Sequence, residues 1–153
     1  MQDKDLKFYA RFFDELSSVQ VYEILKARQT IFTVEQKILY VDADDVDYES
    51  LHCFFLEDKK VEAYLRAFYV TKNGEKLVKI GRVLTLKHGS GLGKMLMEKS
   101  ILAIKERFSC KKICMDAQKH AEGFYKKLGF RTVSDEYLEE GIVHVDMELD
   151  LGN

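Results

Sequence analysis

A strand, a glycine-rich loop and a helix follow one another in the middle of the chain, and this order constrains the fold more than any other feature. Residues 77–86 (LVKIGRVLTL) predict a strand, residues 88–94 read HGSGLGK, and the apolar spacing from Leu92 to about Phe108 predicts a helix. The first amides of a helix have no partner inside it and carry partial positive charge. Glycines let a backbone approach a phosphate closely. The segment therefore predicts an anion-binding site at the start of this helix.

Two familiar phosphate-binding motifs do not fit the loop. A Walker loop has four residues between its first Gly and its Gly-Lys pair, then Ser or Thr. Here three residues separate Gly89 from Gly93, and Met95 follows Lys94. A dinucleotide fingerprint needs Gly-x-Gly-x-x-Gly within a βαβ unit, whereas these glycines alternate and several predicted strands precede them. The pattern argues against both an NTPase and a dinucleotide-binding enzyme.

The remaining periodicities predict a mixed α/β fold. Asn73-Gly74 is a strong hairpin signal between two of the strands. Antiparallel strands come first and helices alternate with strands later, which indicates a mostly antiparallel central sheet with helices on both faces. On the first helix we expect Val21, Leu25, Arg28 and Phe32 to share one face, at spacings of three and four. Strands are expected at residues 7–13, 51–56, 61–70, 77–86, 112–115, 131–133 and 142–149, and helices from Ser17 or Ser18 to before the acidic loop 42–49, at 92–108 and at 121–128.

Composition excludes several classes of protein. The 153 residues suit one domain spanning residues 1–153, and a net charge of −2 offers no basic face for nucleic acid. The apolar runs are far shorter than the roughly 20 residues that span a bilayer, and the N-terminus does not read as a signal peptide. The three cysteines do not match a zinc site. We therefore expect a cytoplasmic protein with reduced thiols, no membrane association and no metal.

Two motifs carry a resemblance to a known family. The glycine loop resembles the Gln/Arg-x-x-Gly-x-Gly/Ala loop of the GCN5-related N-acetyltransferase (GNAT) superfamily, with His88 at the Gln/Arg position followed by Gly91 and Gly93. Further along, the chain resembles the superfamily's second CoA motif, Asn-x-x-Ala-x-x-x-Tyr-x-x-x-Gly-Phe. Gln118 replaces the Asn, and the matching positions are Ala121, Tyr125, Gly129 and Phe130.

Additional segments resemble the ElaA-like branch of the same superfamily. They are residues 28–36, 44–47 with His52, 63–66, 81–83, 117–118 and 140–147, so the resemblance covers nearly the whole chain. It implies an acyl-CoA N-acyltransferase fold in which acetyl-CoA is the cosubstrate and an amine attacks it directly in a ternary complex. It also implies that Tyr125 acts as general acid toward the sulfur, and that a backbone amide near Leu84 or Thr85 stabilises the oxyanion. The CoA-binding positions that follow are Val83, Leu84, Thr85, His88, Gly89, Ser90, Gly91, Leu92, Gly93, Lys94, Gln118, Phe124 and Tyr125.

The acceptor and its base are less constrained. An amine must lose a proton to attack, and Glu35, His52 and His144 are the candidate bases, with Glu35 and His144 preferred. The acidic run 42–49 either attracts a cationic amine or forms solvated surface. The alternatives are a non-catalytic acyl-CoA-binding or partner-binding module, or an acyltransferase resembling acyl-homoserine lactone synthases. Exposed strand edges favour a homodimer, and the sequence leaves the acceptor amine open.

Overall fold

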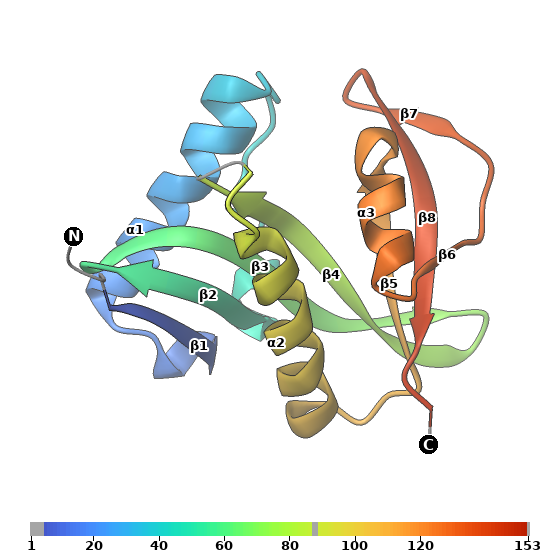
Figure 1. Ribbon diagram of the computed structural model, residues 1–153, viewed down its shortest axis with the longest axis horizontal. Coiled ribbons are helices and arrows are strands. Elements are labelled where there is room, and N and C mark those ends of the chain that lie inside the picture. Colours follow the sequence, from blue (N-terminus) through green and yellow to red (C-terminus); the bar gives the residue numbers. More distant parts are fainter. Residues whose placement is uncertain (1–4, 87–88, 153) are drawn as a thin grey trace.

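One twisted, eight-stranded sheet organises the chain in the computed structural model, which describes residues 5–86 and 89–152 (Figure 1). The strand order is β1-β2-β3-β4-β5-β8-β6, and β7 pairs with β8 beside this path. Neighbouring strands are antiparallel except β4 and β5, which are parallel. The strands are β1 (Leu6–Phe12), β2 (Leu51–Glu57), β3 (Lys60–Lys72), β4 (Glu75–Thr85), β5 (Lys112–Gln118), β6 (Arg131–Thr132), β7 (Tyr137–Glu139) and β8 (Ile142–Asp150).

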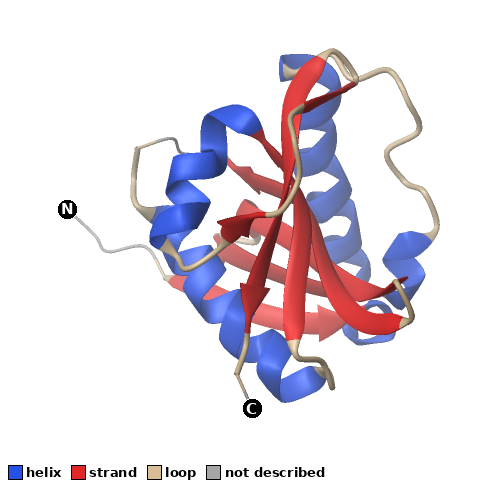
Figure 2. Cartoon of the chain, turned by 90° about the vertical axis from the view of Figure 1, so that its right-hand side faces the viewer, coloured by secondary structure: helices blue, strands red, loops and turns tan. Residues whose placement is uncertain are grey.

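Helices flank the sheet on both sides (Figure 2). The helix α2 (Leu92–Arg107) packs on one face through Leu96, Met97 and Ile104, within the larger of two hydrophobic cores. The helix α1 (Ser18–Arg28) packs on the other face, in the smaller core around Phe54 and Tyr64. The remaining helices are α3 (Glu122–Lys127), a π-helix η2 (Gln29–Glu35) that continues α1, and the 3-10 turns η1 (Phe13–Glu15), η3 (Val46–Glu49) and η4 (Lys119–Ala121).

The sheet splits between its two parallel strands. The β4–β5 pairing is restricted to Val78–Ile80 against Ile113–Met115, after which the strands separate. Figure 1 shows the carboxyl end of β4 diverging from the α3–β7–β8 part of the chain. In β4, Arg82 has a left-handed backbone (φ 55°) at a bulge where the β3 register shifts. A bulge bends its strand and re-aims side chains, and here it lies beside the split.

The fold class and most elements predicted from the sequence are confirmed. The Asn73-Gly74 turn has φ of 49° and 77°, the positive angles that a tight hairpin turn requires. Two expectations were incomplete. The acidic stretch contains the turn η3 rather than loop alone, and the short strand β7 was missed because its residues alternate too briefly to give a signal.

The face expected on the first helix is only partly the one that packs inward: Arg28 is buried, but the buried stripe is shifted away from Leu25. The side chains that pack inward are Ile24, Ala27 and Arg28, whereas Leu25 is 37% exposed. The stripe continues at Ile31 in η2. These positions also follow the i, i+3, i+4, i+7 spacing of a helix face. Ala27 is small, so a hydrophobicity pattern gives this stripe less weight than the face through Leu25.

Candidate active site

A cavity of about 460 Å³ opens at the split between β4 and β5. Its walls come from the end of η2, from β3 and β4, from β5 and α3, and from the β7–β8 turn. A cavity at the diverging ends of parallel strands is a common position for a ligand in an α/β protein. The lining residues are Phe32, Ile38, Tyr40, Arg66, Phe68, Lys79, Ile80, Gly81, Arg82, Val83, Met115, Asp116, Ala117, Gln118, His120, Ala121, Tyr125, Glu139, Glu140 and His144.

Tyr125 reaches this cavity from α3 and is held there by packing. Its ring lies edge-on to Phe124 and Phe130, with centroids 5.2 and 5.9 Å away. Only 7% of the residue is exposed, and burial raises the pKa of its phenol to about 12. The hydroxyl is therefore protonated throughout the neutral range and is available as a donor.

The glycine loop enters α2 through a conformation that suits glycine. Gly89 and Gly91 have φ of 76° and 77°, and a Cβ at either position would meet no heavy atom within 4 Å. The glycines are thus needed for backbone conformation rather than for lack of space. Gly91 is the N-cap of α2 and supplies no side chain to the free amides of the first turn. His88, the predicted first residue of this motif, lies outside the described residues.

The first turn of α2 lies close to the end of β4 and to α3. A Cβ added to Gly93 would lie 3.6 Å from Phe124 Cζ and 3.7 Å from Thr85 Cγ2. Val83 lines the cavity, whereas the Leu84 side chain points into the smaller core. The structure therefore brings three predicted CoA-binding segments together: the end of β4, the loop and α3.

Gln118 lies on the cavity wall with its amide already engaged. Its Nε2 donates to Gln36 Oε1 at 3.1 Å, and His120 Nε2 lies 2.6 Å from its Oε1. This side chain links the end of β5 to the segment that follows η2, across the mouth of the split.

His144, one of the two preferred bases, lines the cavity from β8. It is 6% exposed and its Nδ1 lies 2.8 Å from the Ile142 carbonyl oxygen. Because a carbonyl only accepts, Nδ1 is the donor and the lone pair of the neutral ring is on Nε2. Tyr137 stacks on the ring with centroids 5.9 Å apart, and Glu139 Oε2 is 3.6 Å from Nε2. The ring is thus fixed in the orientation and tautomer that a proton acceptor needs.

The other two candidate bases lie elsewhere. Glu35 is exposed at the end of η2 and is not among the cavity-lining residues. His52 is buried in β2, where Nδ1 lies 2.6 Å from Tyr64 Oη and Nε2 2.9 Å from the Asp47 carbonyl oxygen. Burial lowers the pKa of His52, so this histidine is neutral and structural.

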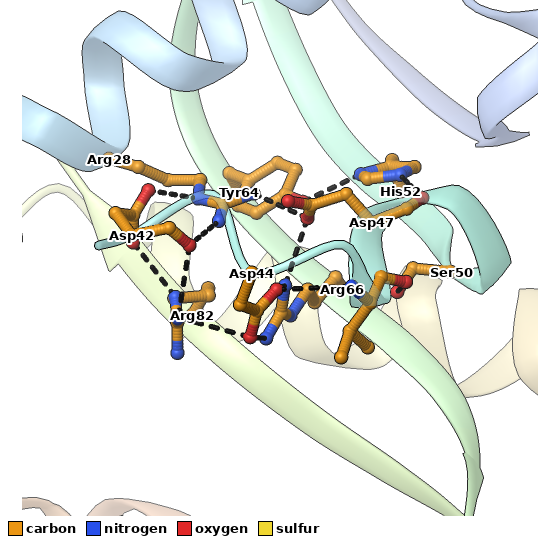
Figure 3. A network of polar contacts seen from close by, with 10 residues as sticks. Arg28, Asp42, Asp44, Asp47, Ser50, His52, Tyr64, Arg66 and Arg82 are labelled. Carbon is orange, nitrogen blue, oxygen red and sulfur yellow. Dashed lines mark hydrogen bonds and ion pairs between the residues drawn. The ribbon is translucent and has the colours of Figure 1, made fainter. Parts of the chain in front are cut away.

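Beside the cavity, three arginines and three aspartates form the cluster in Figure 3, here called the arginine–aspartate cluster. Arg28 has no exposed surface, and its Nε and Nη1 bond Asp42 and Asp47 at 2.8 and 2.6 Å. A buried guanidinium requires such partners, because an unpaired buried charge is very costly. The members are Arg28, Arg66, Arg82, Asp42, Asp44 and Asp47.

This cluster corrects the sequence interpretation of the acidic run. Arg66 makes two 2.7 Å bonds to the Asp44 carboxylate, and Arg82 Nε lies 2.8 Å from Asp42 Oδ1. Three carboxylates of the run are therefore neutralised internally. They neither attract an amine nor form plain solvated surface. The three carboxylates hold the segment before η3 against β3 and β4. Tyr40 belongs to this segment, and it lines the cavity with its ring beneath the Arg82 guanidinium.

We predict that the cluster makes stability depend on acid pH. The hydrogen bonds from Arg66 lower the pKa of Asp44 from 3.8 to about 2, and Arg28 and Arg66 hold that of Asp47 below its usual range against the effect of burial. Between pH 3.8 and about pH 2 these carboxyl groups are largely protonated in the unfolded chain but still ionised in the folded one. The free energy of unfolding should therefore fall as the pH drops from about 4 to about 2.

The measurement is urea unfolding followed by circular dichroism at several pH values. Asp44→Asn should be less stable than the wild type at neutral pH and should lose less stability on acidification. Asp135→Asn, in an exposed loop, serves as the control and should keep the wild-type slope. A wild-type slope in Asp44→Asn would contradict the prediction.

Several lining residues were not identified from the sequence. Lys79 and Asp116 form a 2.8 Å ion pair on the cavity wall, and Glu139 and Glu140 contribute from the β7–β8 turn. Glu140 begins the segment 140–147 that resembles the ElaA-like branch, but no pattern in the sequence assigns either glutamate to a binding site. Within the described ranges, no group of three His, Cys, Asp or Glu side chains is placed to hold a metal, and no helix is long and apolar enough to cross a membrane.

Comparisons with known proteins agree with this geometry. The family described as Acetyltransferase (GNAT) domain matches residues 43–151. A UPF0039 protein of Schizosaccharomyces pombe is 33% identical over 151 residues, covering 96% of this chain and 99% of the relative. The crystal structure of an acyl-CoA N-acyltransferase from Pseudomonas aeruginosa superposes with a TM-score of 0.87 at 30% identity, covering 95% of this chain and 99% of that one. Escherichia coli ElaA gives a TM-score of 0.87 at 29% identity, with 95% and 100% covered. The chain therefore belongs to the GNAT acetyltransferase family, in the branch that includes ElaA and the UPF0039 proteins.

Proposed function

We propose that this acyl-CoA-dependent N-acyltransferase transfers the acetyl group of acetyl-CoA to an amine by direct attack in a ternary complex. The observation that carries the proposal is the cavity in the β4–β5 split, where Tyr125 and His144 line the same space and the first turn of α2 closes against the end of β4. The glycine loop fits a diphosphate because its left-handed glycines leave the surrounding space open and the N-cap residue Gly91 has no side chain to compete for the helix amides. Bound acetyl-CoA would supply a thioester, an acyl donor with a good leaving group.

In this mechanism the chain's own residues orient the reactants and move protons. Residues 89–94 hold the diphosphate through backbone amides, and the separated end of β4, including Leu84 and Thr85, offers a backbone amide to the thioester oxygen. His144 Nε2 accepts a proton from the amine, whose lone pair forms the new C–N bond while the C–S bond breaks. Tyr125 donates to the departing sulfur. Glu35 is the second candidate base, and its place outside the cavity lining makes His144 the preferred one.

Burial determines what kind of donor Tyr125 is. The usual thiol pKa is about 8.5, whereas that of Tyr125 is raised to about 12. The phenol is the weaker acid, so complete proton transfer to the thiolate is uphill. We therefore expect Tyr125 to stabilise the departing sulfur by a hydrogen bond, and the sulfur to gain its proton as CoA leaves.

Gly91→Ala tests the diphosphate site. The substitution should lower acetyl-CoA affinity by roughly tenfold, because a Cβ disfavours the left-handed backbone that aims the amides, at a cost of about 1–2 kcal/mol. Gly74→Ala is a matched control, since Gly74 has the same φ of 77° but lies in the β3–β4 turn. Isothermal titration calorimetry should find a weaker Kd for Gly91→Ala alone. Equal losses in both variants would mean that the effect is a general loss of stability.

Turnover separates the enzyme from a non-catalytic acyl-CoA-binding module. Purified protein is incubated with acetyl-CoA and a panel of amines, and both thiol release and the mass of the acetylated amine are measured. Acetylated product supports the proposal. Tight acetyl-CoA binding without product from any amine would favour the module instead.

We also propose three features of the protein's setting. Residues 1–153 act as one GNAT domain, which is supported by a sheet that includes both the first and the last strand. A cytoplasmic location is supported by three free cysteines, the usual state in a reducing compartment. A homodimer is supported by the edge strand β1, which pairs on one side only in the described sheet. Light scattering after size exclusion tests the dimer, and a monomer at micromolar concentration would exclude it.

A further inference from the structure

The cationic side chains that line the cavity already have carboxylate partners. Arg66 and Arg82 belong to the arginine–aspartate cluster, in which three carboxylates face three guanidinium groups. Lys79 Nζ lies 2.8 Å from Asp116 Oδ2. Among the described residues that line the cavity, every lysine and arginine therefore already has a carboxylate partner, which disfavours an acceptor that carries a carboxylate or phosphate.

Two carboxylates on the opposite wall are not neutralised in this way. Glu139 and Glu140 line the cavity from the β7–β8 turn, and within residues 5–86 and 89–152 neither forms an ion pair with a lysine or arginine. Asp146 lies directly across from the lining residue Asp116 in the β5–β8 pairing and is a further carboxylate on this part of the sheet. The excess charge of this side of the cavity is negative, which favours a cationic ligand.

The His144 ring is a second and independent observation. Only 6% of His144 is exposed, and its ring lines the cavity. Its Nδ1 donates a hydrogen bond to the Ile142 carbonyl oxygen. Its Nε2 makes no hydrogen bond with any residue that the structure describes; the neighbouring Glu139 oxygen is 3.6 Å away. The lone pair on Nε2 is therefore open to a hydrogen-bond donor in the cavity, and an amine is such a donor.

We infer, on the basis of the acetyl transfer proposed above, that the acceptor is a diamine or polyamine. One nitrogen lies at His144 Nε2 and a second, permanently protonated nitrogen is held by Glu140, with Glu139 between them. The reacting nitrogen gives one proton to Nε2 and bonds the acetyl carbon as the C–S bond breaks, while the distant ammonium keeps its proton. The cavity also offers apolar side chains, including Ile38, Phe68 and Tyr40, against which a methylene chain can pack.

The same charges disfavour amines that carry a carboxylate. An amino acid would place its carboxylate near Glu139 and Glu140 with no free cation to balance it. Like charges a few ångströms apart near a protein surface repel each other. The cavity therefore selects against zwitterionic acceptors as well as for dications.

Three acceptors of equal chain length test the inference: 1,4-diaminobutane, butylamine and 4-aminobutyrate. At low salt we expect kcat/KM for the diamine to exceed that for butylamine by about tenfold, and 4-aminobutyrate to be the poorest. Glu140→Gln should reduce the diamine-to-butylamine ratio to near one. Glu136→Gln is the matched control, because Glu136 lies in the segment before the same hairpin but pairs with Lys119 outside the cavity.

A salt series on the wild-type protein gives a readout that needs no variant. The diamine advantage should shrink as ionic strength rises and screening shortens from about 10 Å at 0.1 M to about 3 Å at 1 M. A diamine-to-butylamine ratio near one in the wild type, a ratio unaffected by Glu140→Gln in folded protein, or a preference for 4-aminobutyrate would overturn the inference. These results leave acetyl transfer intact, whereas failure of every amine would overturn the transfer itself.

Discussion

Tyr125→Phe is expected to lower kcat by about 10²-fold while leaving the Kd for acetyl-CoA nearly unchanged. The substitution removes the hydroxyl but keeps the ring that packs between Phe124 and Phe130. Since the buried phenol has a pKa of about 12, it is protonated at every pH at which the enzyme is assayed. The ratio of wild-type to variant kcat should therefore be constant from pH 6 to pH 9. Removing a group that titrates in this range would instead give a ratio that changes with pH.

Steady-state kinetics at saturating acetyl-CoA measures the change in kcat, and calorimetric titration of CoA measures the change in affinity. Tyr22→Phe is the control, because Tyr22 is 66% exposed on α1 and lies outside the cavity. An unchanged kcat in Tyr125→Phe would remove this residue from the donor role. A large loss of CoA affinity would instead assign it to binding.

Local patterns account for the parts of this fold that could be predicted. The strand, the glycine loop and the helix follow one another within about thirty residues, and each is defined by neighbours in sequence, so α2 begins at Leu92 as expected. Hairpins are similarly local, and the Asn73-Gly74 turn appears where its residues require it. The resemblance to the GNAT family added Tyr125 and Gln118, which both reach the cavity.

The rest depends on contacts between distant segments. Arg66 meets Asp44 across 22 residues, and Arg82 meets Asp42 across 40. In the sequence the acidic run has the appearance of a solvated loop, because its partners are scattered over one helix and two strands. Arg28 similarly interrupts the apolar stripe of α1, although it is fully buried. A hydrophobicity pattern cannot assign a charged residue to the core until its counter-ions are known.

Arg28→Met is expected to lower the free energy of unfolding by about 3–5 kcal/mol, the usual effect of removing one partner from a buried ion pair. Methionine fills much of the space but leaves Asp42 and Asp47 without the Arg28 bonds, which are 2.8 and 2.6 Å long. For a chain of this size, the midpoint of thermal unfolding should fall by roughly 10 °C. Arg131→Met is the control: Arg131 pairs with Asp150 at 2.7 Å, but both side chains are more than half exposed, so its loss should cost at most about 1 kcal/mol.

A double variant distinguishes an orphaned charge from lost packing. Asp47 makes the shorter of the two Arg28 bonds, and in Arg28→Met/Asp47→Asn its charge is removed as well. If the unpaired charge of Asp47 causes the drop in stability, this double variant should be more stable than Arg28→Met. Arg28→Lys keeps the charge but cannot bond both aspartates as a fork, and should lie between the wild type and Arg28→Met. Urea unfolding of the wild type, the three Arg28 variants and Arg131→Met tests the series. Equal stabilities for Arg28→Met and Arg131→Met would mean that the cluster contributes no more than surface ion pairs, and that packing around α1 and η2 alone holds this wall of the cavity.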